Sequence, residues 1–96
     1  MPTYEPLPRF LRDYVRLDEN QTVAWERALA LFVDGLRTGH FAAILRIKRV
    51  RGYDGVWEMT WAPDGRATFH YGDEIRLGTP HVVWRRIGTH DIFRQP

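Results

Sequence analysis

The first 40 residues carry hydrophobic side chains at the spacing of two amphipathic helices. A first helix is predicted over residues 7–17, with a proline in its first turn, where no backbone N–H is needed. A second follows Asp18 or Asn20, either of which can cap it, and stops at Gly39. A three- or four-residue link makes the pair a helical hairpin. The apolar stripes are Leu7, Phe10, Leu11, Tyr14 and Val15, then Trp25, Ala28, Leu29, Phe32, Val33 and Leu36.

From residue 42 onward the pattern is that of β-strands. Four runs are separated by turn-forming segments rich in glycine, proline and aspartate. Helices followed by strands predict one α+β domain over residues 1–96. Its helical hairpin packs on one face of a mainly antiparallel sheet of about four strands, and a short turn or helix closes the chain. Irregular structure is expected at residues 1–5, 73–79 and 94–96. The strand runs are AAILRIKRVR, VWEMTWA, RATFHYG and HVVWRRIG.

The turn at residues 63–65 predicts the register of the central hairpin. A three-residue loop with glycine in the left-handed position pairs Ala62 with Arg66 and, further out, Glu58 with His70. Because side chains alternate faces, the aromatic and aliphatic residues share the core side. The other side is expected to be open to solvent or ligand. Alternatively, Glu58 and His70 are an ordinary cross-strand pair on a polar outer face. The polar set is Glu58, Thr60, Arg66, Thr68 and His70.

The last strand run, HVVWRRIG, places apolar residues on both of its faces. A bulge would explain this pattern, and so would an aromatic side chain on the open face, where Trp84 would stack on a base. A buried tryptophan is the commoner case. The pattern does not decide whether Arg85 or Arg86 faces the polar side.

Basic residues are concentrated rather than numerous. The formal net charge is only +2, yet Arg46, Lys48, Arg49 and Arg51 fall within six positions with no acid among them. This segment is either a solvated strand edge that blocks aggregation or a track that faces phosphates, and the two interpretations are compatible. In the predicted sheet, Arg46 and Lys48 share the polar face.

Several classes of protein are disfavoured by composition. The chain has no cysteine, and its four histidines lack zinc-site spacing, so no metal or other cofactor is expected. No apolar run approaches the roughly 18 residues that span a bilayer, and the N-terminus has no signal pattern. The default expectation is a soluble cytoplasmic protein without a membrane partner.

The segment RRIGTHDIF, residues 85–93, combines residues suited to phosphate chemistry. Arg86 keeps its charge at all ordinary pH values, and His90, four positions later, titrates near neutrality. An alternative role is local: Thr89 can cap a short final turn that contains His90 and Asp91.

Together these elements resemble the RelE/ParE superfamily of toxin–antitoxin toxins over nearly the whole chain. The ending is similar to that of YafQ-type ribosome-dependent mRNA interferases, which close with Arg-x-Gly-[Thr/Ser]-His and then a phenylalanine, here Phe93. The GVWE segment at residues 55–58, with Arg66 opening the next strand, is similar to the hairpin of YoeB-type members. The spacing of Phe93 from His90 is one residue shorter than usual. The strand that opens most members would be reduced to a few residues, since residues 1–8 contain three prolines.

The resemblance implies metal-independent cleavage of mRNA in the ribosomal A site, opposed by a tightly bound antitoxin protein. It implies catalytic or phosphate-binding roles for Arg66, Arg86 and His90, and base contact by Phe93. Glu58 is a weaker parallel, and His70 would replace a second family histidine only by geometry. The alternatives are a gyrase poison of the ParE type and a degenerate homologue that only binds its antitoxin or a nucleic acid. Further expected RNA contacts are Arg46, Lys48, Arg51 and Arg85.

Overall fold

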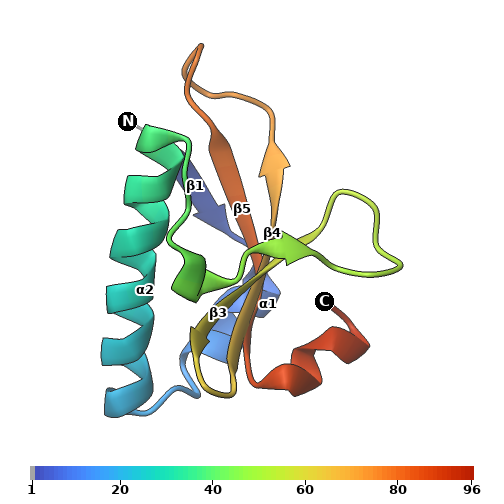
Figure 1. Ribbon diagram of the computed structural model, residues 1–96. Coiled ribbons are helices and arrows are strands. Elements are labelled where there is room, and N and C mark those ends of the chain that lie inside the picture. Colours follow the sequence, from blue (N-terminus) through green and yellow to red (C-terminus); the bar gives the residue numbers. More distant parts are fainter. Residues whose placement is uncertain (1) are drawn as a thin grey trace.

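The computed structural model describes residues 2–96 and contains a five-stranded sheet with two helices on one face (Figure 1). The strand order is β1-β5-β4-β3-β2. Met1, the first residue of the segment expected to be irregular, lies outside the described residues. The elements are β1 (Thr3–Pro6), α1 (Pro8–Tyr14), α2 (Glu19–Thr38), the 3-10 turn η1 (Ala43–Leu45), β2 (Lys48–Arg49), β3 (Trp57–Ala62), β4 (Gly65–Gly72), β5 (His81–Gly88) and the 3-10 turn η2 (His90–Arg94).

The helices begin and end where local chemistry directs them. The Asp18 side chain accepts a hydrogen bond from the Gln21 N–H (2.8 Å), and the Gln21 side chain accepts one from the Asp18 N–H (2.9 Å). Gly39 ends α2 with φ of 82°, a left-handed conformation that glycine adopts without strain. The first helix was predicted too long, because its apolar stripe is used only in part: Leu11 and Val15 are 52% and 79% exposed.

The core lies between the helices and the sheet, and Trp84 of β5 is at its centre. This indole is 3% exposed, so the alternative in which it stacks on a base from the open face is wrong. Its ring centroid lies 5.0–6.0 Å from those of four aromatic residues in both helices and in β4, which are Phe10, Trp25, Phe32 and Phe69.

The fifth strand is β1, which runs parallel to β5 at the edge of the sheet. The expectation of about four strands is therefore one short, and the first strand is reduced to four residues as the prolines indicated. After Pro6 the chain leaves the ladder, with a last bond from the Leu7 N–H to the Trp84 carbonyl (2.9 Å). Helix α1 then lies beside β5 where β1 would have continued.

The strand predicted over residues 42–51 is wrong. Residues 43–45 form η1, and Arg46 takes a left-handed conformation (φ 48°) that interrupts any strand. Only Lys48 and Arg49 pair with β3.

The predicted register of the β3–β4 hairpin is wrong by two residues. The loop contains only Pro63 and Asp64, so Ala62 pairs with Gly65, and an extra residue at Trp61 then shifts the pairing. Glu58 faces Thr68 and not His70. Because the error is even, the side chains keep their predicted faces, and Met59, Ala67 and Phe69 are completely buried on the helix side.

A bulge in β5 explains why Trp84 and Ile87, three positions apart, both face the core. Val83, which pairs with His70, remains a buried apolar residue on the polar face. Phe69 pairs with Trp84 and Thr68 pairs with Arg86, which leaves Arg85 as the extra residue. The bulge brings both arginines to the polar face: Arg86 stands opposite Thr68, and Arg85 contacts His70.

The face opposite the helices is not fully open, contrary to the sequence-based expectation. The turn η2 packs against β4 and β5 on this side, as Figure 1 shows, and its Ile92 is 5% exposed. Thr68 is completely buried. Residues 95 and 96 also make ordered contacts, although the tail was expected to be irregular. No helix within residues 2–96 is long and apolar enough to cross a membrane.

Candidate functional site

The register places four of the predicted site residues in two cross-strand rows on the polar face. One row runs through Lys48, Glu58, Thr68 and Arg86, from β2 to β5. The next row pairs Thr60 with Arg66 and Arg66 with Gly88. Arg66 and Arg86 are therefore diagonal neighbours on adjacent strands, close enough for long side chains to act on one group.

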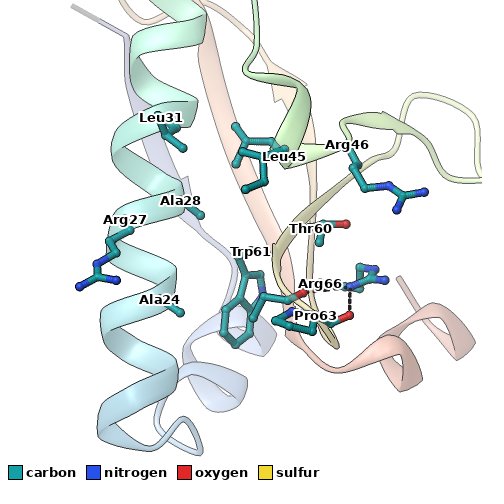
Figure 2. A pocket seen from close by; sticks show the side chains of 12 residues that line it. Ala24, Arg27, Ala28, Leu31, Leu45, Arg46, Thr60, Trp61, Pro63 and Arg66 are labelled. Atoms are coloured by element: carbon teal, nitrogen blue, oxygen red, sulfur yellow. Dashed lines mark hydrogen bonds between the residues drawn. The ribbon is translucent and has the colours of Figure 1, made fainter.

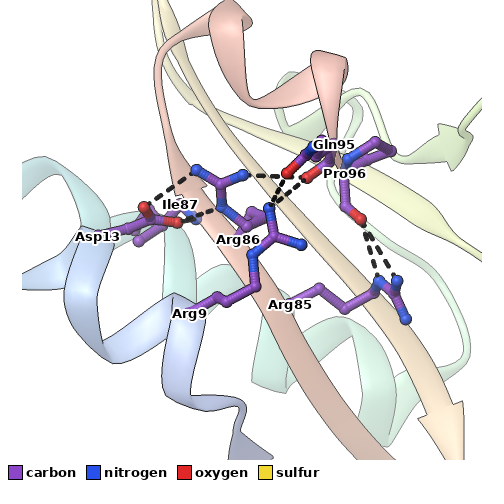
Figure 3. Close-up of polar contacts among 7 residues, drawn as sticks. All are labelled: Arg9, Asp13, Arg85, Arg86, Ile87, Gln95 and Pro96. Atoms are coloured by element: carbon purple, nitrogen blue, oxygen red, sulfur yellow. Dashed lines mark hydrogen bonds and ion pairs between the residues drawn. The ribbon is translucent and has the colours of Figure 1, made fainter.

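Arg86 is the most constrained cation of this face. Its Nε and Nη2 donate to the two carboxylate oxygens of Asp13 in α1 (2.6 and 3.1 Å), and its Nη1 donates to the main-chain oxygen of Gln95 (3.0 Å; Figure 3). The Arg86 and Asp13 side chains are 20% and 12% exposed. Asp13 compensates much of the charge of the Arg86 guanidinium. Two of the five N–H groups of this guanidinium remain for a ligand.

The fold explains why Asp13 is there. Where α1 replaces β1 beside β5, the Ile87 N–H has lost its strand partner, and the Asp13 carboxylate accepts from it (3.2 Å). Asp13 was not foreseen as a site residue. In the helix predicted over residues 7–17 it is one more polar position beside the apolar stripe, and nothing in the sequence distinguishes it from a solvent-exposed carboxylate.

Arg85 and His70 form a second contact on the polar face, at 3.1 Å between Nη1 and Nδ1. Burial lowers the pKa of His70, and the positive charge of Arg85 lowers it further. Smaller effects come from Glu5, which raises this pKa, and from His81, which lowers it. Because arginine has no acceptor, Nδ1 of His70 is unprotonated and the neutral ring carries its proton on Nε2. His70 is thus placed to donate a hydrogen bond from Nε2.

Glu58 and Arg66 have different surroundings. The Glu58 side chain is 13% exposed and lies 3.9 Å from the Lys48 ammonium. Arg66 Nη1 donates to three main-chain oxygens of the hairpin turn, at 3.0–3.3 Å. These bonds hold the guanidinium of Arg66 against the hairpin turn, and its Nε and Nη2 have no hydrogen-bond partner within residues 2–96.

A cavity of about 560 Å³ lies between α2 and the β3–β4 hairpin, and Arg46 and Arg66 contribute to its wall. Figure 2 shows Arg46, Thr60 and Arg66 on the side of the hairpin away from α2, whereas Arg27 points outward from the helix. The arginines border this cavity without converging in it, so the polar face is the better candidate site.

The turn η2 presents the histidine of the C-terminal segment. Thr89 caps it as predicted, with its hydroxyl accepting from the Asp91 N–H (3.3 Å). His90 is exposed, and its ring meets that of Phe93 edge to face with centroids 4.8 Å apart. Thr89 therefore caps this turn, and His90 in the same turn is still exposed to solvent.

The other basic residues of the segment from residue 46 to residue 51 lie in different surroundings. Arg51 is exposed in the loop between β2 and β3, and Lys48 lies on the edge strand. Arg49 stacks over Trp57 (5.4 Å to the ring centroid), so it has a structural contact in addition to its charge. Among residues 2–96, no three histidine, aspartate or glutamate side chains are close enough to hold a metal ion.

The sheet order, the two helices and the C-terminal turn define the RelE-like toxin fold. No protein-family model and no curated protein matches the sequence of this chain. The similar proteins were found among solved structures. A chain of the E. coli DinJ–YafQ toxin–antitoxin complex matches with a TM-score of 0.72 and 15% identity, over 94% of this chain and 93% of that one.

Two further likenesses span bacteria and archaea. The YoeB/ParE toxin from Agrobacterium tumefaciens matches with a TM-score of 0.68 and 15% identity, over 92% of this chain and 98% of that one. A chain of the RelB–RelE complex from Methanococcus jannaschii matches with a TM-score of 0.60 and 12% identity, over 93% of each. At these identities the likeness establishes the fold.

Proposed function

We propose that the protein is the toxin of a toxin–antitoxin system and acts as a ribosome-dependent mRNA endoribonuclease. The observation that carries the proposal is the polar face at the end of β5. There Arg86 is fixed by three hydrogen bonds, and η2, which packs on the same strands, presents an exposed His90. Both residues belong to the segment that resembles the ending of YafQ-type interferases.

Metal-independent RNA cleavage makes three demands that these side chains meet. The ribose 2′-OH must lose a proton, the extra charge on phosphorus must be stabilised, and the leaving 5′-oxygen must gain a proton. Guanidinium groups suit the second task, and a histidine suits the first or the third. Arg66 and Arg86, diagonal neighbours in the sheet, bind the scissile phosphate, and His90 is the general acid or base.

The complementary acid–base group is Glu58 or His70, and the geometry favours Glu58. His70 uses its free Nδ1 lone pair to accept from Arg85, whereas Glu58 lies in the same cross-strand row as Arg86. Phe93 contacts a base next to the cut. Arg46, Lys48, Arg51 and Arg85 bind the RNA backbone.

Induced expression with mapping of cleaved mRNA tests the proposal. Removing a general acid–base group costs about 100- to 10,000-fold in rate, and removing a group that stabilises the transition-state charge costs about 100- to 1,000-fold. His90→Ala and Arg86→Ala should therefore each abolish detectable cleavage. The exposed Arg12→Ala on α1 is the matched control. Thermal unfolding shows whether each variant is folded. Full activity in both site variants would exclude this assignment.

A 2′-deoxy substitution at the cut site tests the chemistry itself. If the 2′-OH is the nucleophile, the substituted RNA binds but is not cleaved. Cleavage at an unchanged rate would mean that water attacks the phosphate instead.

A non-catalytic function is the second candidate, and one observation favours it. Both arginines assigned to the phosphate already have protein partners, Asp13 for Arg86 and the hairpin turn for Arg66. The protein would then be a gyrase poison or a binder of antitoxin or nucleic acid. A supercoiling assay with purified gyrase identifies a gyrase poison, because an endoribonuclease leaves gyrase unaffected. Growth arrest on induction separates a toxin from a protein that only binds.

The proposal includes a protein antitoxin as partner. Two of the structurally similar chains belong to toxin–antitoxin complexes, DinJ–YafQ and RelB–RelE. The chain also has an apolar groove of about 510 Å³ between α1, β1 and α2, where Tyr4 and Leu11 are 73% and 52% exposed. Such a surface suits a protein partner. Co-expression with the product of a neighbouring gene should relieve growth arrest.

A further inference from the structure

Three arginines gather where α1, β5 and the last residues meet (Figure 3). Arg9 Nη2 donates to the side-chain oxygen of Gln95 (2.9 Å) and to its main-chain oxygen (3.4 Å). Arg86 Nη1 donates to the same main-chain oxygen (3.0 Å), and Arg85 donates to that of Pro96 (3.3 and 3.4 Å). We call Arg9, Arg85 and Arg86 the arginine cluster.

Positive charge is in excess in this cluster. Within residues 2–96, Asp13 is the only side-chain carboxylate that forms an ion pair with any of its members, and that pair is with Arg86. The acceptors that Gln95 supplies to Arg9 and Arg86 are neutral amide oxygens. Arg9 and Arg86 share one of them, so two like charges are held close together. A phosphate, with its negative charge and several acceptor oxygens, would satisfy such a site better than a single amide carbonyl does.

The position of Arg9 in α1 is not explained by the helix itself. A cation in the first helical turn opposes the helix dipole. Arg9 also stands four residues before Asp13 on the same helix face, yet they form no ion pair, because Asp13 is occupied by Arg86 and the Ile87 N–H. Arg9 therefore points toward the Arg86 end of the polar face with no acid of its own.

We propose that Arg9 binds a phosphate of the RNA strand, next to the phosphate held by Arg86, and that Gln95 occupies this position in the free protein. The identity of the ligand as RNA rests on the proposed function. The site would extend the RNA contacts from the sheet onto α1. The RNA must displace the Gln95 oxygens, which are weaker partners for a guanidinium than a charged phosphate is.

The test is the affinity of the full chain for a single-stranded RNA that carries a 2′-deoxy sugar only at the cut site, measured by fluorescence anisotropy at several salt concentrations. Arg9→Gln should weaken binding about tenfold at low salt. It should also reduce the slope of log affinity against log salt by about 0.7, the loss of one phosphate contact on a single strand. Arg12→Gln, which removes an exposed arginine of the same helix, should change neither quantity beyond its small general charge effect.

A second variant probes the competition by Gln95. Gln95→Glu places a carboxylate where Oε1 already accepts from Arg9, so the affinity for RNA should fall. In the Arg9→Gln background the same change should cost several-fold less. Asn20→Glu, on the exposed first turn of α2, controls for the added negative charge. Inorganic phosphate as competitor distinguishes a strand phosphate from a free anion, since a site for free phosphate would be blocked by it at millimolar concentration.

The outcomes separate this inference from the proposed function. Equal affinity and equal salt slope in Arg9→Gln and Arg12→Gln would overturn the inference, and so would a wild-type chain that binds no RNA at low salt. Binding that depends on Arg9 in a chain that cleaves no mRNA would leave the inference standing and reject the endoribonuclease function.

Discussion

The two faces of the sheet are stabilised by contacts of different kinds. On the helix side, Trp84 packs against aromatic rings from α1, α2 and β4, and each ring has several neighbours. On the polar side, Arg86 depends on one carboxylate 73 positions earlier in the chain and on one carbonyl nine positions later. Each aromatic ring of the core therefore has several packing partners, whereas each charged group on the polar face has only one or two hydrogen-bond partners.

This difference indicates which part of the molecule can change its chemistry without losing its fold. A register prediction that is wrong by two residues still assigns every side chain to its correct face, so the apolar core is predicted correctly even when the pairing is not. The pairing of a charged group has no such tolerance, because it requires atoms within about 3 Å. The polar face is therefore the part of the molecule in which single substitutions change chemistry and leave the fold intact.

The largest predicted effect is in the core. Phe32 is 1% exposed, and its ring lies 5.0 Å from that of Trp84. Phe32→Ala should lower the free energy of unfolding by about 3–5 kcal/mol, through lost burial and a cavity. Its neighbour Val33, 37% exposed, is the control, and Val33→Ala should cost less than about 1 kcal/mol. Urea unfolding measures the free energy of unfolding of both variants. Equal decreases would mean that Phe32 is no more tightly packed than the partly exposed Val33.

The second prediction compares a shielded ion pair with an exposed one. Asp13→Ala leaves Arg86 and the Ile87 N–H without their acceptor in a site only 12–20% exposed, so stability should fall by about 2–3 kcal/mol. Asp34→Ala removes the partner of Arg37 in a pair about 60% exposed, and should cost less than about 0.5 kcal/mol. Similar losses in the two variants would show that the Asp13 contact contributes no more than a surface pair.

The fold was largely predictable because its signals are local and repeated. The cap at Asp18, the stop at Gly39 and the inward side of β3 and β4 each follow from a few adjacent residues. The errors arose where one residue departs from the pattern. The two-residue loop and the unpaired Trp61 each shifted the hairpin register by one residue, and the left-handed Arg46 replaced a predicted strand by η1.

The candidate site was predictable in its residue types but not in their partners. The alternation of side chains placed Glu58 and Arg66 on one face correctly, and the Thr89 cap was confirmed. Asp13 and Gln95 were not foreseen, because they are brought to Arg86 by the departure of α1 from the sheet edge and by the fold of the tail. Such contacts depend on tertiary structure alone.

The third prediction concerns a helical glycine on the core side. Gly35 lies inside α2, where glycine is disfavoured, and a β-carbon there would overlap Cδ1 of Phe41, whose ring stacks on Phe32. Gly35→Ala should therefore lower stability by about 1–2 kcal/mol despite the better helix propensity of alanine. Thr38→Ala, at the exposed end of the same helix, is the control. A stabilised Gly35→Ala variant would mean that Phe41 moves aside freely and that the core is looser than its aromatic contacts indicate.

The smallest effect is a pH dependence on the polar face. The pKa of His70 lies below its usual value of 6.5 in the folded protein, chiefly because of burial and secondly because of Arg85. As pH falls through 6.5, the unfolded chain binds a proton that the folded protein does not, so the free energy of unfolding decreases toward acid. His70→Gln keeps an acceptor for Arg85 but cannot titrate, and should flatten this decrease in urea unfolding between about pH 7.5 and 5. The exposed His40→Gln is the control. If His70→Gln left the acid slope unchanged, the pKa of His70 would be the same in the folded and the unfolded protein, and neither its burial nor its contact with Arg85 would hold in solution.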